Sequence, residues 1–341
     1  MKPSSAKTAL SYLVTQQRPA FLWGAPGIGK SDLVAQVAQA NGMQLIDVRL
    51  NLLDPVDLKG FPVPDMTEKL MNWLPANFLP PMQVKGKGGK MVPNPGKYLL
   101  FLDEMNAALP AMQAAAYQLI LNRRIGDYVL PNGASIMAAG NREGDRSVTN
   151  RMPAALANRL VHIDFEANLD DWCTWAVDND ISTDLIAFMR FRPSMLHMFD
   201  PAANAKAFPT PRSWAFVDQI YKSGMTPDIE FELIKGTVGE GAGSEFSAFT
   251  RTLKDLPSID KIMLNPDKVP VPENPAVLYA LSTALGAKAT KDCFDRLMIY
   301  ITRMPTEFQV VSVRDAVKRD DKVCDTKSFT AWSIANASVL T

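Results

Sequence analysis

The sequence predicts an α/β protein with a parallel sheet, followed by a mainly helical C-terminal part. Three observations support this. A short apolar run at 20–23 leads through a glycine-rich loop into a helical pattern at 31–40. A second apolar run at 45–48 completes a strand–helix–strand unit, which crosses right-handed into a parallel sheet. From residue 168 onward the apolar spacing is helical.

The loop between the first strand and the first crossover helix has the spacing Gly-x-x-x-x-Gly-Lys-Ser. It comprises Gly24, Ala25, Pro26, Gly27, Ile28, Gly29, Lys30 and Ser31. In a phosphate-binding loop, backbone N–H groups surround the phosphates of a nucleotide, the lysine reaches the β- and γ-phosphates, and the hydroxyl binds Mg²⁺. The following helix directs its positive end at the same phosphates. The alternative is a glycine-rich turn between a strand and a helix, and the complete spacing with both flanks disfavours it.

Five strand candidates predict a single sheet. They lie at 21–23, 45–48, 98–102, 135–139 and 160–165, and four helical crossovers separate them. Between the second and third strands, residues 54–97 contain eight prolines and predict irregular chain. Part of it, 61–95, reads as an insertion, with a flexible basic loop at 85–90. A functional insertion and a solvated connecting loop are equally compatible with this composition.

Two adjacent carboxylates follow the third apolar strand. If the sheet is parallel, Asp103 and Glu104 lie beside the mouth of the first strand, where the phosphate loop begins. Asp103 is the candidate Mg²⁺ ligand, directly or through water, and Glu104 is the candidate group that polarises the attacking water. Alone, an acidic strand end is common; after a phosphate loop, the pair indicates ATP hydrolysis.

Three more residues are candidates for the same chemistry. Asn141 ends the fourth strand and can hold the water or the γ-phosphate, although a turn-forming asparagine reads equally well. Arg159 precedes the fifth strand, and Arg212 begins a later helix. The charge on a transferring γ-phosphoryl group requires a cationic partner, but a single arginine is more often part of a surface salt bridge.

Composition limits the remaining classes. Lysine plus arginine equals aspartate plus glutamate at 36 each among 341 residues, so no overall charge favours nucleic acid. There is no run of 18 apolar residues, which argues against a membrane span. The three cysteines are far apart and form no disulfide framework, which fits a cytoplasmic location.

Taken in order, these motifs resemble the AAA+ ATPases, and among them the MoxR-like, dynein-related branch. Residues 24–31 resemble Walker A, 99–106 Walker B, and 138–141 sensor 1. Residues 155–160 resemble the arginine-finger segment, 209–212 the sensor 2 arginine, and 57–60 with the loop after them the helix 2 insertion. Arg151 is a rival for the finger, because it lies close by. The resemblance covers residues 18–250.

The resemblance implies a nucleotide-binding core at 1–167, a helical lid at 168–255, and a linker with a mainly helical extension at 256–341. It also implies ATP and Mg²⁺ as cofactors, and a homo-oligomer, either a hexameric ring or a helical assembly. Arg159 would then act on a neighbour's nucleotide. The expected partners are a protein client and a von Willebrand factor A domain protein, with a role in remodelling, activation, or metal or cofactor insertion. Two alternatives remain open: a nucleic-acid motor and an ATP-dependent assembly module.

Overall fold

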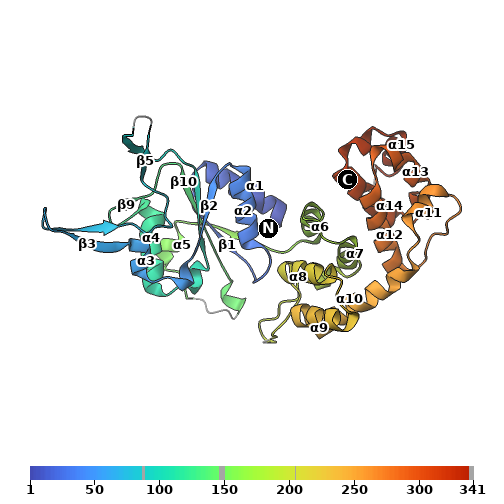
Figure 1. Ribbon diagram of the computed structural model, residues 1–341, viewed down its shortest axis with the longest axis horizontal. Helices are drawn as coiled ribbons and strands as arrows, with labels where there is room; N and C mark the ends of the chain where they lie inside the picture. The colour runs from blue at the N-terminus through green and yellow to red at the C-terminus, as the bar shows by residue number, and fades with distance from the viewer. Residues whose placement is uncertain (87–88, 146–149, 204, 338–341) are drawn as a thin grey trace. The chain divides into compact units, whose positions relative to one another are not determined.

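The computed structural model describes residues 1–86, 89–145, 150–203 and 205–337 (Figure 1). The chain forms two compact units. The first contains Met1–Asp171 and Phe199–Asn204, and the second contains Trp172–Met198 and Ala205–Thr341. No helix among the described residues is long and apolar enough to cross a membrane.

The first unit is built on a sheet of five parallel strands in the order β11-β1-β10-β7-β2. In chain order, they are β1 (Ala20–Trp23), β2 (Gln44–Arg49), β7 (Tyr98–Asp103), β10 (Ala134–Gly140) and β11 (Val161–Asp164). Because every strand runs in the same direction, all five carboxyl ends meet at one edge and all five amino ends at the other. The predicted α/β class with a five-stranded parallel sheet is therefore confirmed.

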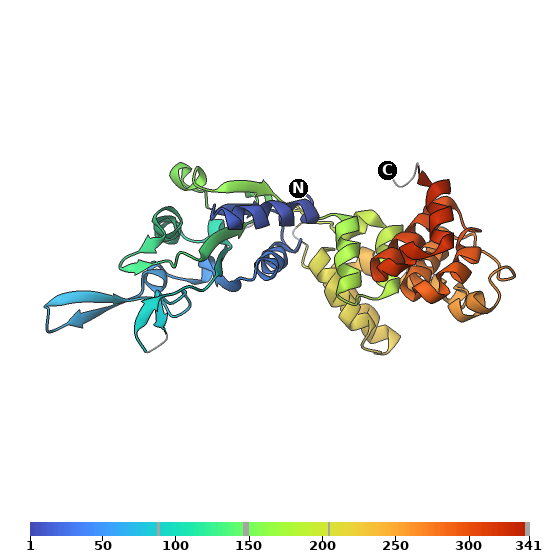
Figure 2. The ribbon, with the colours of Figure 1, turned by 90° about the horizontal axis from the view of Figure 1, so that it is seen from above.

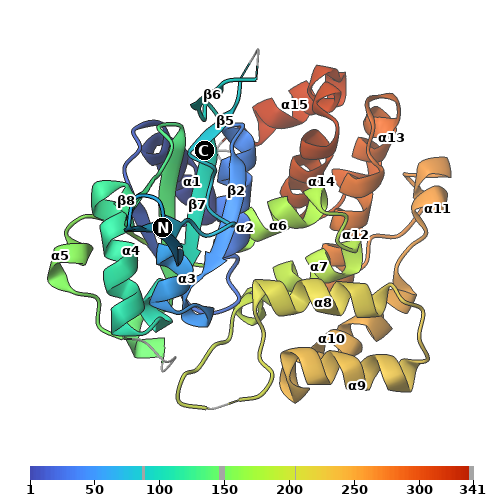
Figure 3. The ribbon, with the colours of Figure 1, turned by 60° about the vertical axis from the view of Figure 1, so that its left-hand side comes forward.

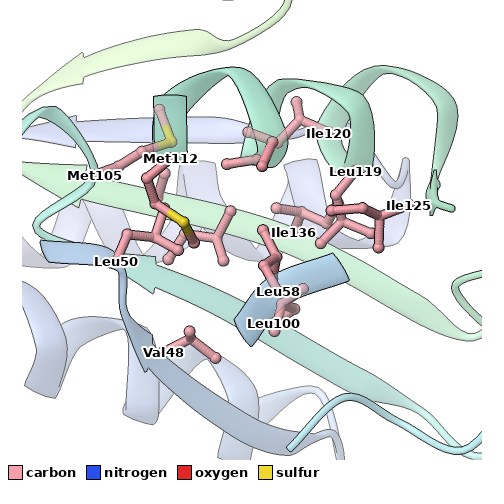
Figure 4. Close-up of a cluster of buried hydrophobic side chains, with 14 of the residues drawn as sticks. Val48, Leu50, Leu58, Leu100, Met105, Met112, Leu119, Ile120, Ile125 and Ile136 are labelled. Carbon is pink, nitrogen blue, oxygen red and sulfur yellow. The ribbon is translucent and has the colours of Figure 1, made fainter. Parts of the chain in front are cut away.

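Helices cover both faces of this sheet. Helices α1 (Pro3–Thr15) and α2 (Lys30–Ala40) pack on one face, and α3 (Pro55–Lys59), α4 (Pro110–Asn122) and α5 (Ala154–Ala157) on the other (Figure 3). The alternation of side chains along each strand fixes this arrangement. In β7, Leu99 and Phe101 face α1 and α2, while Leu100 and Leu102 face α4. Figure 4 shows the cluster on the α4 side, where Met112, Leu119 and Ile136 lie together.

The proline-rich segment differs from the irregular chain predicted for it, because it forms two hairpins. Strands β3 (Phe61–Asp65) and β4 (Leu70–Leu74) make the longer one, which extends away from the sheet of its own unit (Figure 2). Strands β5 (Gln83–Lys85) and β6 (Met91–Pro93) make the shorter one. Lys87 and Gly88 of the predicted basic loop lie outside the described residues. A third small hairpin pairs β8 (Arg124–Ile125) with β9 (Tyr128–Val129).

The second unit is helical, as predicted for the C-terminal part. Its α-helices are α6 (Leu169–Asp178, which begins in the first unit), α7 (Thr183–Phe191), α8 (Pro211–Tyr221), α9 (Pro227–Val238), α10 (Glu240–Thr252), α11 (Ile259–Leu264), α12 (Pro275–Lys288), α13 (Lys291–Ile301), α14 (Thr306–Arg319) and α15 (Lys327–Ala335). The glycine-rich stretch 239–243 separates α9 from α10 by one residue only, although its composition suggests a longer interruption. Gly239 alone has a left-handed φ of 87°, and α10 begins at the next residue.

A buried ion pair ties three helices of the second unit together. Arg190 of α7 donates from Nη1 and Nη2 to the two carboxylate oxygens of Asp315 on α14, at 2.6 and 2.7 Å. Its Nη1 also donates to Thr283 Oγ1 on α12 at 2.9 Å. Side-chain exposure is 6% for Arg190 and 9% for Asp315. With so little solvent, neither charge is stable unless the other is present.

We therefore expect Asp315→Ala to lower the unfolding free energy of the second unit by about 3–5 kcal/mol, because it leaves the Arg190 guanidinium buried without a counter-charge. Lys291→Ala is the matched control. It breaks the exposed pair of Lys291 and Asp325, which contributes roughly 0–1 kcal/mol. Urea unfolding followed by tryptophan fluorescence, to which the buried Trp214 of the same unit contributes, measures both. Equal losses in the two variants would contradict a structural role for the buried pair.

Candidate functional site

The glycine-rich loop connects β1 directly to α2, as the sequence predicted. Gly29 precedes the first residue of α2 with a φ of 93°, a left-handed conformation in which a side chain is strained. This turn brings the first N–H groups of α2 to the carboxyl edge of the sheet. Free N–H groups at a helix start, together with the helix dipole, favour a bound anion at that point.

Lys30 lies across the loop that precedes it. Its ammonium donates to the carbonyl oxygens of Gly24 at 2.7 Å and Ala25 at 3.0 Å, and to Oδ1 of Asn141 at 2.9 Å. Asn141 follows β10, the strand next to β1, and the Gly24 N–H donates to the Gly140 carbonyl. The structure thus brings together Lys30 and Asn141, which are 111 residues apart in the chain.

Ser31 and Asp103 form a second pair at the same edge. The Ser31 hydroxyl lies 3.1 Å from Oδ2 of Asp103, which ends β7. The strand carrying Asp103 is not beside β1 as expected; β10 lies between them, and the loop with the start of α2 bridges the two-strand gap. Two adjacent ligands of an octahedral Mg²⁺, each about 2.1 Å from the metal, lie about 3.0 Å apart. The hydroxyl and carboxylate oxygens match that separation, and both are hard ligands of the type that Mg²⁺ prefers.

The acidic character of this edge extends to β2. Partial desolvation and, second, the negative charge of Asp103 raise the pKa of Asp47, while Arg49 acts in the opposite direction. Among the described residues, no cluster of three histidine, cysteine, aspartate or glutamate side chains could hold a metal.

Glu104 leaves β7 in an unusual backbone conformation. Its φ of 55° and ψ of 32° lie in the left-handed region, which non-glycine residues seldom adopt. Its N–H donates to Oδ1 of Asp103 at 2.9 Å, and this bond orients the Asp103 carboxylate. Residues held in such conformations cluster at functional sites. The turn at Glu104 ends the alternation of side chains between the two faces of the sheet immediately after Asp103. The Glu104 side chain is partly buried.

The sequence reasoning gave no role to Asn106, although it lies within the Walker B match. Its side chain is 2% exposed, and Nδ2 donates to the Asn141 carbonyl at 2.7 Å. Its Oδ1 lies so close to Gly140 that an added Cβ there would be only 1.9 Å away. Asn106 therefore fixes the end of β7 against the end of β10. A buried asparagine after a strand-end carboxylate pair is the only signal the sequence offers for it.

The two candidate finger arginines lie near opposite edges of the sheet. Asn150, beside Arg151, donates its N–H to the Asn106 carbonyl at 2.6 Å, which places Arg151 next to the carboxyl edge. Arg159 lies two residues before Val161, which pairs with Ala20 at the start of β1, and so belongs to the amino edge. Both side chains are exposed.

Arg212 belongs to the second unit. It follows Pro211 at the start of α8, where Thr210 accepts from the Ser213 N–H at 3.0 Å and caps the helix. The arginine side chain is exposed, and its sensor role stays a prediction. Arg142, beside Asn141, carries a different function from the candidates. It contacts Asp164 at 3.7 Å and Glu166 at 3.4 Å, and so links the end of β10 to the end of β11.

Sequence similarity to a known protein covers part of the chain. No family model matches the chain. Over 200 residues it is 28% identical to Midasin from Giardia intestinalis, a match that covers 55% of this chain and 4% of Midasin. The chain's α/β core, built on a five-stranded parallel sheet, and its helical C-terminal part are those predicted from the sequence.

Three solved structures similar to this chain each have a TM-score below 0.5. A putative ATPase from Cytophaga hutchinsonii is 13% identical, with a TM-score of 0.36, covering 91% of this chain and 79% of that chain. The Thermotoga maritima RuvB Holliday junction branch migration motor is 15% identical, with a TM-score of 0.38, and the match covers 83% of this chain and 80% of that chain. NtrX from Brucella abortus in complex with ADP is 12% identical, with a TM-score of 0.41, and the match covers 99% of this chain and 68% of that chain.

Lys30→Ala should abolish ATP binding while leaving the fold intact, because it removes the only cation built into the loop. Calorimetric titration with ATP measures the binding, and circular dichroism checks the fold. Lys7→Ala is the matched control, since Lys7 is a lysine of the same unit whose Nζ contacts Gln36 rather than the loop. Near-normal ATP affinity in Lys30→Ala would refute the assignment of the phosphate loop.

Proposed function

We propose that this protein is a MoxR-like AAA+ ATPase that hydrolyses ATP to remodel or activate a protein client. The observation that carries the proposal is the convergence of Lys30, Ser31, Asp103 and Asn141 on one edge of the sheet. A loop that only bound a nucleotide would not require a strand-end carboxylate beside the loop serine. That pair supplies a cation site next to the place where phosphates would lie.

In this proposal, Ser31 and Asp103 would hold Mg²⁺, and the ion would supply positive charge to offset the negative charge of the nucleotide phosphates. Lys30 exchanges its bonds to Gly24 and Ala25 for bonds to phosphate oxygens. Glu104 accepts a proton from the attacking water as the bond between the γ-phosphorus and its bridging oxygen breaks, giving ADP and phosphate. Asn141 orients that water or the γ-phosphate without adding charge, and it remains within reach of Lys30.

We further propose that the active form is a homo-oligomer, a hexameric ring or a helical assembly. Arg159 at the amino edge lies away from the phosphate loop of its own sheet, so its use in hydrolysis requires a second copy. Arg151 remains the rival for this role. Residues 168–255 would act as the lid, with Arg212 as the sensor of the γ-phosphate, and a von Willebrand factor A domain protein is the proposed partner.

The β3–β4 hairpin supports contact with a protein client. Its exposed apolar side chains include Phe61, Met66, Leu70, Met71 and Leu74, with exposures from 56 to 84%. Soluble proteins seldom expose so many neighbouring apolar side chains unless the surface binds something. The hairpin contributes no residue to the buried core clusters of the sheet. Its apolar surface is therefore available for binding rather than needed for packing.

The prolines of β3 restrict how such a client can bind. Pro62 and Pro64 lie opposite Trp73 and Met71. Since proline has no N–H, both must occupy positions that point away from β4, so the outer edge of β3 lacks two donors. The paired positions Met71 and Trp73 then direct their N–H and C=O groups outward from β4. An extended client segment would therefore add to the β4 edge.

Glu104→Gln separates binding from chemistry. It preserves shape but removes the base, so we expect ATP binding to persist and turnover to fall at least tenfold, about 1.4 kcal/mol of transition-state stabilisation. Phosphate release and ATP titration measure the two quantities. Glu143→Gln provides a control at another strand-end carboxylate, since Glu143 follows β10 in the same unit. Unchanged turnover in Glu104→Gln would make Glu104 a structural residue.

The client-binding role of the hairpin is tested by Met66→Lys with Met71→Lys. Both side chains are more than half exposed, so the melting temperature should stay close to that of the wild type and the rate of basal hydrolysis within twofold of it. Stimulation of hydrolysis by an unfolded model polypeptide such as casein should be lost. Ile334→Lys, at an equally exposed position of α15, should keep it. A large fall in the melting temperature would instead show that the hairpin is needed for folding.

A further inference from the structure

The second unit contains a cavity of about 430 Å³. Most of its lining comes from α6, α7, α12 and α14, and α12 packs against both α7 and α14 (Figure 3). Among the lining residues, Ile186, Thr283 and Asp315 are buried and form its inner part, whereas Lys288 and Arg319 are exposed and lie at its rim. The cavity therefore joins a buried interior to a charged opening.

A glycine allows the two helices that form one side of this cavity to approach closely. A Cβ added at Gly286 of α12 would lie only 2.6 Å from the Cβ of Asp315 on α14. Thr283 and Ala287, one turn apart on α12, line the cavity from one helix. Asp315 and Arg319, one turn apart on α14, line it from the other. The close approach thus sets two side-chain rows along one space.

The inner part of the cavity presents little free polarity. Both carboxylate oxygens of Asp315 accept from Arg190, and the Thr283 hydroxyl accepts from the same guanidinium at 2.9 Å. Arg190 therefore offsets the charge of Asp315. The rest of the wall is largely aliphatic, and comprises Val177, Ile181, Ile186, Ile259, Ala284 and Ala287. An apolar group placed against this wall would be removed from water, which is favourable.

The rim of the cavity carries an excess of positive charge. Lys222 is paired with the buried Asp218 at 2.8 Å. Over the described ranges of the chain, neither Lys288 nor Arg319 forms an ion pair. The one carboxylate that lines the cavity besides Asp315 is that of Asp180, which is exposed. Two cations without a partner thus stand against one carboxylate, and an anion at the rim would be attracted to them.

We propose that this cavity binds a small aliphatic carboxylate, with the carboxylate held at the rim by Lys288 and Arg319 and the alkyl chain along the aliphatic wall. The guanidinium offers a pair of donors that matches the two oxygens of a carboxylate. An aliphatic amine would instead place a third positive charge beside the two cations. The cavity volume falls in the range of small-molecule sites, about 300–1,000 Å³. The site involves no residue of the first unit, and the inference does not depend on ATP hydrolysis.

The first experiment tests the chemistry of the ligand, with octanoate as the probe. Octanoate is titrated by calorimetry into the full-length protein, and we expect saturable binding. Acetate lacks the chain and octylamine reverses the charge, so each should bind at least tenfold more weakly. No binding of octanoate would overturn the site. Equal binding of acetate would overturn the role of the aliphatic wall, and equal binding of octylamine would overturn the preference for an anion.

The second experiment tests the location of the site. The double variant Lys288→Ala with Arg319→Ala should bind octanoate at least tenfold more weakly, and it should fold normally because both side chains are exposed. Lys291→Ala with Arg314→Ala is the matched control, since it removes an exposed lysine and an exposed arginine that do not line the cavity. Saturating octanoate should also raise the melting temperature of the wild type and the control, but not of the first variant. Equal binding by the two double variants would overturn the assignment to this cavity. Neither readout involves ATP, so failure of the proposed ATPase activity leaves this test intact.

Discussion

Parallel pairing of five strands gives the sheet of this protein two chemically different edges. At the carboxyl edge, loops and a helix start bring together two hydrogen-bonded pairs, Lys30 with Asn141 and Ser31 with Asp103. At the amino edge, the turns before β1 and β11 collect arginines. In each group, residues from distant segments of the chain lie together. Both are consequences of strand direction and register, so reversing one strand would disperse them. The proposed chemistry therefore requires the direction and register of the strands, because these bring the side chains together.

Much of the carboxyl edge could be predicted from the sequence, because its signals are local. The phosphate loop is continuous in the chain, Asp103 ends one buried strand, and Asn141 directly follows another. The lateral order of the strands could not be predicted, since no local pattern states that β10 lies between β1 and β7. Asn106 escaped for a related reason: its role depends on the close approach of Gly140, 34 residues later, and that contact appears only when both strands are placed.

Local signals were least informative where proline and glycine have more than one compatible structure. Prolines at 62 and 64 suggest irregular chain, yet both fit a hairpin strand because their missing donors point outward. Glycines at 241 and 243 suggest a break, yet they lie within α10, where Gly243 allows close packing against the backbone of Lys235. A cavity at the amino edge brings together Arg18, Arg123 and Arg159, which are separated by 105 and 36 residues along the chain. Amino-acid composition does not reveal which distant residues meet in the folded chain.

The two prolines of β3 also bear on how crowded copies of this protein behave. A strand that exposes apolar side chains and an open row of backbone groups is the usual seed of fibrils, because each added strand presents a new edge to the next. Here the hairpin has one edge that accepts a strand and one that lacks two donors. Two hairpins that meet through β4 bury both acceptor edges, and what remains outward is β3 on either side. The missing donors at Pro62 and Pro64 would then disfavour the addition of a further strand to either outer edge.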